Sequence, residues 1–143
     1  MSDLRIERTF AASAEDLFDA WTSPEVMRRW LHCGPDWVTP VADVDLRVGG
    51  QVRVVMRRPD GTESEMRGEY TVIDRPNRLE MAWTFYDDPE NLQLIELAFS
   101  ERGDGTTTAV LVNSRISTDE RRAGQDWGWR SCLDELGALL ASR

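Results

Sequence analysis

The sequence predicts an α+β protein in which a curved antiparallel sheet wraps around a long C-terminal helix. Three observations predict this fold class. A strand pattern at the N-terminus is followed at once by two short helical segments, the middle of the chain alternates polar and apolar residues between short turns, and one long amphipathic helix closes the chain. Strands joined by few residues must be antiparallel neighbours, and the apolar face of their sheet needs a helix to cover it. Such a shape tends to hold a cavity.

The first element is a strand over residues 5–10, and two helices follow it over about 13–21 and 23–30. A serine caps each helix. The first helix has an aspartate three residues after its serine, where a negative charge favours the helix dipole. The second helix has proline at its first helical position, where the missing N–H costs nothing.

Period-two alternation and turn residues predict six further strands. Gly49-Gly50 ends the first of them, and Pro59-Asp60-Gly61 is a strong hairpin turn between the second and third. The predicted strands cover residues 41–47, 51–57, 63–72, 79–85, 93–100 and 107–115.

The strand over 93–100 has two possible inward faces. Gln93, Ile95, Leu97 and Phe99 make the cleaner apolar set, so we expect them to face inward and Glu96 to be solvated. The opposite register would bury Glu96, raise its pKa and make it a possible acid/base group.

The final helix is predicted over about 118–141, with a capping box from Ser117 to Glu120. Gly124 and Gly128 lie on one face of it, and a glycine inside a helix costs about 1 kcal/mol relative to alanine. Either the helix backbone approaches the sheet closely there, or volume is left for a guest molecule with Trp127 as one wall. We favour close packing. The apolar stripe of the helix consists of Trp129, Cys132, Leu133, Leu136 and Leu140.

Composition narrows the class of protein. A chain of 143 residues with no linker or repeat is most simply one domain, residues 1–143. The net charge of −9 argues against nucleic acid, since phosphate binding needs clustered cations. No apolar run is long enough to span a membrane, and the N-terminus lacks a signal pattern, so we expect a cytoplasmic protein. Monomer and homodimer both remain open.

Few residues point to catalysis or metal binding. His32 is the only histidine, and Cys33 and Cys132 match no metal spacing. A cytosolic chain keeps such cysteines reduced. We therefore expect no metal or other cofactor, and a binding protein more than an enzyme. We interpret His32 in the first place as a loop residue after the second helix. It is also a candidate for contacting a ligand at a cavity mouth.

Four blocks follow one another along the chain: Phe10–Glu25 with Trp30, Asp43–Gly50, Gly68–Leu79 and Gly128–Leu136. In this order they resemble bacterial proteins related to the activator of heat-shock protein 90 ATPase, a family of the START-like (SRPBCC), helix-grip superfamily. The resemblance covers nearly the whole chain. It implies the helix-grip fold and an elongated, largely apolar cavity between the C-terminal helix and the sheet. Relatives in the superfamily bind lipids, sterols or polyketides there, and a minority catalyse cyclisation or dehydration.

Three functions follow as hypotheses. The first is a small-molecule-binding protein that holds an apolar or aromatic ligand under the C-terminal helix. The second is a chaperone-associated interaction protein, and the third is a cyclase or dehydratase that would need His32 or an inward carboxylate. Methionine and aromatic side chains adapt to apolar ligands but also fill ordinary cores. The candidate lining residues are Trp30, His32, Trp37, Met56, Met66, Met81, Trp83, Phe85 and Trp127.

Overall fold

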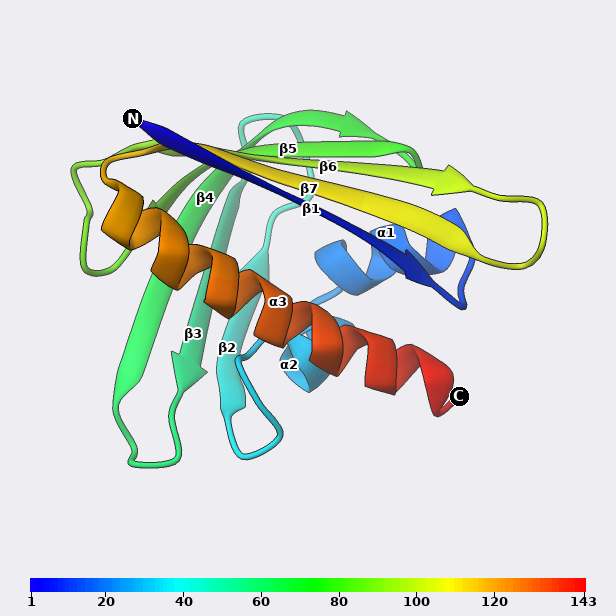
Figure 1. Ribbon diagram of the computed structural model, residues 1–143, viewed down its shortest axis with the longest axis horizontal. Coiled ribbons are helices and arrows are strands. Elements are labelled where there is room, and N and C mark those ends of the chain that lie inside the picture. The colour runs from blue at the N-terminus through cyan, green and yellow to red at the C-terminus, as the bar shows by residue number, and fades with distance from the viewer.

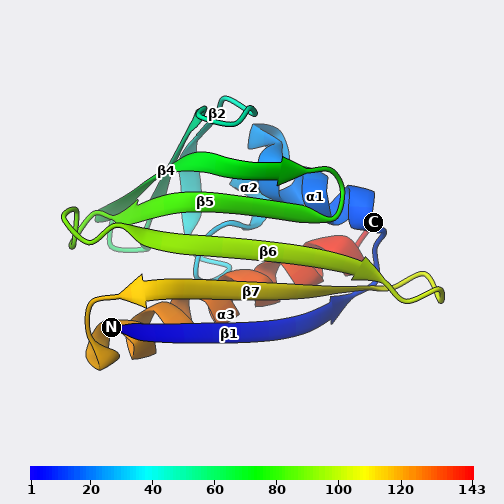
Figure 2. The ribbon, with the colours of Figure 1, turned by 90° about the horizontal axis from the view of Figure 1, so that it is seen from above.

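The computed structural model describes residues 1–143 and places one long helix across the concave side of a seven-stranded antiparallel sheet (Figure 1). Seen from above, strands cover the helices, and α3 runs beneath β7 and β1 (Figure 2). The predicted helix-grip arrangement is confirmed. The elements are β1 (Ser2–Phe10), α1 (Ala14–Thr22), α2 (Pro24–Trp30), β2 (Val38–Val44), β3 (Gln51–Arg57), β4 (Glu63–Asp74), β5 (Arg78–Phe85), β6 (Gln93–Glu101), β7 (Thr107–Ile116) and α3 (Asp119–Ala141).

Short connections give the sheet its order, β1-β7-β6-β5-β4-β3-β2. Strands β2 to β7 each pair with their sequence neighbours, as expected for a meander. Only β1 pairs out of sequence, because it joins β7 at the far edge. The two short helices that follow β1 lie on the concave side of the sheet and close one end of it (Figure 1).

The strand predicted over 41–47 is displaced toward the N-terminus. Residues 45–50 form a tight turn in which the Arg47 N–H bonds Asp45 O at 2.9 Å and the Gly50 N–H bonds Arg47 O at 2.7 Å. Gly49 has a φ of +85°, which favours glycine. A Cβ on Gly50 would lie 1.9 Å from Asp45 O, so the strand must end before this close approach.

The cap of α3 lies one residue later than predicted. Thr118 Oγ1 accepts the Arg121 N–H at 3.1 Å, so Thr118 is the N-cap and the predicted box from Ser117 to Glu120 is wrong. The physical reason is competition, because the Ser117 hydroxyl bonds Asp88 Oδ2 at 2.9 Å in the loop after β5.

The predicted inward face of β6 is confirmed: Gln93, Ile95, Leu97 and Phe99 are all buried. Glu96 points outward and pairs with Arg78 Nη2 at 3.2 Å. Partial burial and neighbouring Glu80 raise the pKa of Glu96, but the carboxyl lies on the side of the sheet away from α3. On β4 an irregularity between Tyr70 and Val72 ends the predicted alternation, and Val72 is half-buried.

The core is dense where α1 and α2 meet the second half of α3. Trp30 is fully buried, and its Nε1 donates to Ala20 O at 2.9 Å. Trp21 packs edge-on against Trp30 at 4.8 Å between ring centroids and lies 5.8 Å from Trp129, which confirms Trp21 as a core residue. The first half of α3 has no such filling beneath it.

Candidate ligand-binding site

A cavity of about 600 Å³ lies between the first half of α3, strands β3 to β5 and the segment after α2. Sites for small molecules usually have volumes of 300–1,000 Å³. Of its 20 lining residues, 11 are hydrophobic. Its aromatic and methionine lining consists of Trp37, Met56, Met66, Trp83, Phe85, Tyr86, Trp127 and Trp129.

Two of the three glycines of α3 line this space, Gly124 at its exposed mouth and Gly128 half-buried farther in. A Cβ on Gly124 would meet no heavy atom within 4 Å, and one on Gly128 would meet only Cys33 Sγ, at 3.9 Å. Our expectation that these glycines allow close approach of the helix to the sheet is therefore wrong. The helix stands away from the sheet there, and the missing side chains leave volume in the cavity.

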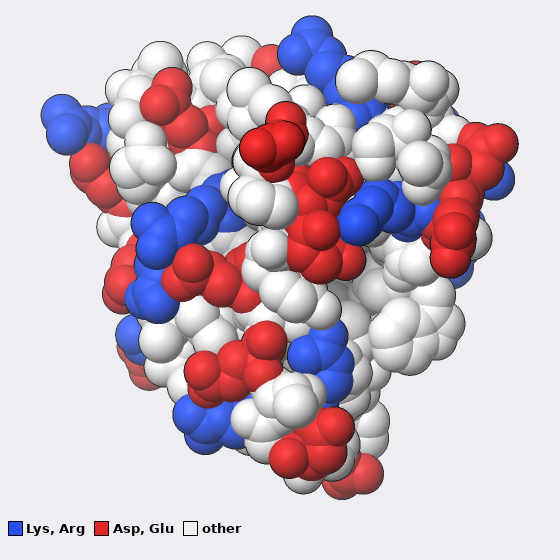
Figure 3. All heavy atoms as spheres, turned by 90° about the vertical axis from the view of Figure 1, so that its left-hand side faces the viewer, with Lys and Arg blue, Asp and Glu red and all other residues white.

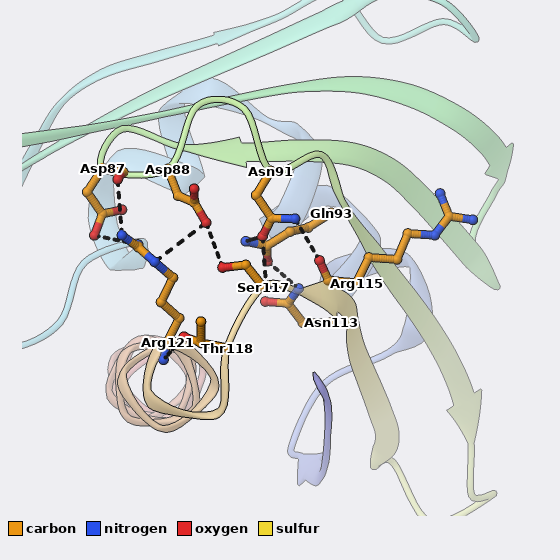
Figure 4. Close-up of polar contacts among 9 residues, drawn as sticks. All are labelled: Asp87, Asp88, Asn91, Gln93, Asn113, Arg115, Ser117, Thr118 and Arg121. Carbon is orange, nitrogen blue, oxygen red and sulfur yellow. Dashed lines mark hydrogen bonds and ion pairs between the residues drawn. The ribbon is translucent and has the colours of Figure 1, made fainter. Parts of the chain in front are cut away.

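A chain of hydrogen bonds fixes the inner wall. Trp129 Nε1 donates to Asn113 Oδ1 at 3.0 Å. Asn113 Nδ2 donates to Gln93 Oε1 at 2.9 Å, and Gln93 Nε2 donates to Asn91 Oδ1 at 3.1 Å (Figure 4). Trp129, Asn113 and Gln93 are at most 5% exposed. Buried polar groups need such partners, so the chain holds the Trp129 ring in one orientation against the cavity.

Ion pairs tie the loop after β5 to the start of α3 at the mouth. Arg121 Nη1 lies 2.9 Å from Asp87 Oδ2, and Arg121 Nε lies 3.5 Å from Asp88 Oδ2 (Figure 4). Asn91 adds a bond from its Nδ2 to Arg115 O at 2.9 Å. Figure 3 views this side of the molecule, where side chains of both charges border a hollow among uncharged atoms.

Two thiols meet at the cavity wall beside α2. Cys33 Sγ and Cys132 Sγ are 3.8 Å apart, and both residues line the cavity. The hydrogen bond with Cys132 lowers the pKa of the Cys33 thiol, and the charge of Arg58 adds to this against the opposing effect of burial. The same hydrogen bond and burial raise the pKa of Cys132.

Residues 11–141 match the model of a family described as Activator of Hsp90 ATPase homolog 1-like protein, AHSA1. The chain belongs to the AHSA1 family. No protein among those with curated descriptions is significantly similar to it in sequence.

Solved structures agree with this membership. The AHSA1 protein from Silicibacter pomeroyi is 25% identical, with 98% of each chain covered and a TM-score of 0.83. A protein from Chromobacterium violaceum shares the fold at 20% identity, with 98% of each chain covered and a TM-score of 0.83. An HSP90 activator from Plasmodium falciparum shares it at 22% identity, with 97% of this chain and 96% of that chain covered and a TM-score of 0.76.

In this AHSA1-family protein, six of the nine candidate residues line the cavity: Trp37, Met56, Met66, Trp83, Phe85 and Trp127. Trp30, His32 and Met81 do not. Trp30 belongs to the dense core. Met81 lies on the same β5 face as Trp83 but two residues farther from the mouth, and it is 3% exposed in the closed core. The lining also includes Arg58, Tyr86 and Trp129, which were not among the residues predicted from the sequence.

His32 is a buried structural residue of this family member. Thr39 Oγ1 donates to Leu31 O at 2.7 Å, so it must accept the Nδ1–H of His32 at 2.8 Å. His32 Nε2 lies 4.0 Å from Glu135 Oε1. Burial lowers the pKa of His32, and the Glu135 carboxylate opposes this only in part. The imidazole is therefore neutral near pH 7, and it lies outside the cavity lining.

We expect acid to destabilise the fold through His32. Its folded pKa lies below the unfolded value of about 6.5, so the unfolded chain binds the proton first as the pH falls. The stabilisation is complete above about pH 6.5 and is lost as the pH falls through the folded pKa. Urea unfolding at pH 7 and pH 5 measures it. His32→Gln should show a smaller loss between the two pH values, and an equal loss would contradict this assignment.

The thiol pair predicts selective alkylation. With iodoacetamide at pH 8, we expect Cys33 to react first, because its pKa is lowered and it is only partly buried, whereas Cys132 is 1% exposed with a raised pKa. Mass spectrometry should find one adduct on the native protein and two after denaturation. Cys33→Ser should abolish the native adduct. Preferred labelling of Cys132 would contradict the prediction.

No helix has the length and apolar character needed to cross a membrane. No group of three or more histidine, cysteine, aspartate or glutamate side chains is placed to hold a metal ion.

Proposed function

We propose that this AHSA1-family protein binds an apolar or aromatic small molecule in the cavity beneath α3. The observation that carries the proposal is the pair of helical glycines that face unfilled space. Alanine at these two positions would stabilise the helix by about 1 kcal/mol each without a steric conflict. The chain instead keeps a void lined by aromatic rings and methionines, which is the usual chemistry of an adaptable apolar site.

The wall residues support binding as well as enclosure. Trp83 lies 6.3 Å from Phe85 and 6.4 Å from Trp129 between ring centroids, so three rings from β5 and α3 form one side of the cavity. Such rings offer large apolar area with few rotatable bonds, which keeps the entropy cost of binding small. Trp127 is 59% exposed at the mouth, where a bound ligand would cover it.

Native mass spectrometry of the protein purified from its own host tests the proposal. We expect a co-purified small molecule that is lost on denaturation. As a second measurement, the neutral dye Nile red should bind with quenching of tryptophan fluorescence. A protein that carries no co-purified molecule and leaves Nile red unbound would overturn the proposal.

A chaperone-associated role is the second candidate, and family membership favours it. The family description names an activator of the Hsp90 ATPase, and a structural neighbour from Plasmodium falciparum is called an HSP90 activator. The test is the ATPase rate of the Hsp90 homologue from the same organism, with and without this protein. An unchanged rate would remove this candidate.

The cyclase or dehydratase alternative needed His32 or an inward carboxylate such as Glu96 in the cavity. Neither residue lines it. The carboxylates that do line it are Asp87, which is paired with Arg121, and Glu120, which is exposed at the start of α3, so neither is the buried acid that this alternative needed. We also propose that the protein is cytoplasmic, where its thiols would stay reduced.

A further inference from the structure

Arg58 is a cation in the wall of an otherwise largely apolar cavity. It follows β3 at the next inward position after Met56, and both residues line the cavity. Its guanidinium carbon lies 5.3 Å from the Trp37 ring centroid and 6.0 Å from that of Tyr86. Two aromatic rings of the wall therefore hold the charge in place by cation–π attraction.

No carboxylate pairs with Arg58. Its bonds are two long ones to neutral groups, from Nη2 to Tyr86 Oη at 3.3 Å and from Nη1 to Thr62 Oγ1 at 3.4 Å. Nearby Asp60 bonds the Thr62 N–H at 2.9 Å and the Thr62 hydroxyl at 2.7 Å. These bonds lower the pKa of Asp60 and the Arg58 charge adds to this, but the two side chains form no ion pair. A guanidinium has five N–H donors, so Arg58 keeps the capacity to bind an anion.

The other charged lining residues do not neutralise Arg58. Arg121 is already paired with Asp87 and Asp88 at the mouth. Glu120, in the first turn of α3, is exposed and forms no ion pair with Arg58. The charge of Arg58 affects another lining residue, because it helps to lower the pKa of the Cys33 thiol. The cavity thus has largely apolar walls and one positive charge without a carboxylate partner.

A second observation supports a ligand with a polar end. Ser64 Oγ, Trp83 Nε1 and Gln125 Oε1 are buried without a hydrogen-bond partner, and all three residues line the cavity. Ser64 on β4 pairs in register with Met56, two residues before Arg58. Buried polar groups without partners are rare in folded proteins, and three of the five in this chain belong to residues that line the same space as the unpaired cation.

We propose that the cavity takes an amphipathic monocarboxylate, with its apolar body among the aromatic rings and methionines and its carboxylate on Arg58. This inference rests on the proposed function and adds the chemical class of the ligand. A carboxylate matches the guanidinium in geometry and charge, and charge-assisted bonds between them are about twice as strong as neutral ones. A neutral ligand of the same shape would leave Arg58 unpaired.

The test compares dodecanoate, dodecanol and dodecylamine, each below its critical micelle concentration, by tryptophan fluorescence and calorimetry. We expect wild type to prefer dodecanoate over dodecanol by about tenfold or more, as one charge-assisted contact allows. Arg58→Gln should lose this preference and keep its affinity for dodecanol. Arg58→Lys should retain part of it. Arg29→Gln is the matched control, since Arg29 is exposed on α2 and forms no ion pair.

The outcomes separate the two proposals. Equal binding of dodecanoate and dodecanol by wild type, or a preference for dodecylamine, would overturn the carboxylate inference but leave the apolar cavity as a binding site. A preference for dodecanoate that persists in Arg58→Gln would also overturn it. If none of the three probes nor Nile red binds, both proposals fail. Circular dichroism must show the same fold for each variant. If Arg58→Gln does not fold, the salt dependence of wild-type binding is the test instead. The preference of wild type for dodecanoate should then be lost in high salt, and a salt-independent preference would overturn the inference.

Discussion

Replacing Gly128 with leucine is expected to abolish ligand binding while the protein stays folded. The Cβ position of Gly128 faces the cavity, with Cys33 Sγ at 3.9 Å as its only near neighbour. A leucine side chain would enter the space beside Trp129 and Cys132, where the ligand's apolar body is proposed to lie. We expect affinity for dodecanoate, dodecanol and Nile red to fall by at least about a hundredfold, equivalent to roughly 2.7 kcal/mol.

Alanine substitutions at Gly124 and Gly128 distinguish filling of the cavity from strain in the helix. Gly128→Ala and Gly124→Ala should each raise the free energy of unfolding by about 1 kcal/mol, because alanine favours the helix and nothing obstructs its Cβ. Gly137→Ala is the matched control on the same helix. Its Cβ would lie 3.9 Å from Phe10 Cε1, and Gly137 lies away from the cavity, so it should gain similar stability without loss of binding.

Two results would contradict this account. If Gly128→Leu binds the probes as wild type does, the cavity is not the binding site. If Gly124→Ala and Gly128→Ala destabilise the protein by 1 kcal/mol or more, the glycines serve close packing after all.

The fold could be predicted because its signals are local. The strand over residues 51–57 and the inward face of β6 follow from alternation, which depends on the chain alone. The cap of α3 could not be placed so well. Ser117 is the better cap by sequence, because Glu120 lies three residues after it. The choice of Thr118 depends on Asp88, which binds the Ser117 hydroxyl from a loop 29 residues earlier in the chain.

The cavity was harder to predict because a strand face does not show what lies opposite it. Met81 and Trp83 share a face of β5, yet only Trp83 reaches the cavity. That difference depends on where α3 stands away from the sheet. Arg58 did carry a usable signal, since it continues the inward alternation of Val54 and Met56 as a charged residue in an apolar series.

Asn113 carried a similar signal. It follows Ala109 and Leu111 on the inward face of β7, and it lies opposite Ile95 in the sheet. An amide at such a position needs partners, and Gln93 on the neighbouring strand is the inward polar residue that could provide one. The sequence did not indicate that the indole of Trp129, on α3, lies next to Asn113 and completes the chain of bonds.

Removing the Asn113 side chain should cause the largest loss of stability of any single polar change in this site. Asn113→Ala would leave the Trp129 indole N–H and the Gln93 carbonyl buried without partners, and each costs about 1–3 kcal/mol. We expect the free energy of unfolding to fall by about 2–5 kcal/mol and Tm by roughly 5–15 °C. Urea and thermal unfolding measure both. Ser114→Ala, half-buried on the same strand, is the control and should cost less than about 0.5 kcal/mol.

A double-mutant cycle tests whether this cost comes from the bonded chain. Trp129→Phe removes the indole N–H, so Asn113→Ala should cost at least about 1 kcal/mol less in that background than in wild type. Additive costs would show that the bond to the Trp129 indole contributes nothing to the cost of Asn113→Ala. Because Trp129 forms part of the inner wall, Asn113→Ala should also weaken dodecanol binding. Unchanged affinity would mean that the Trp129 ring holds its place without this bond, and that the wall is set by α3 itself.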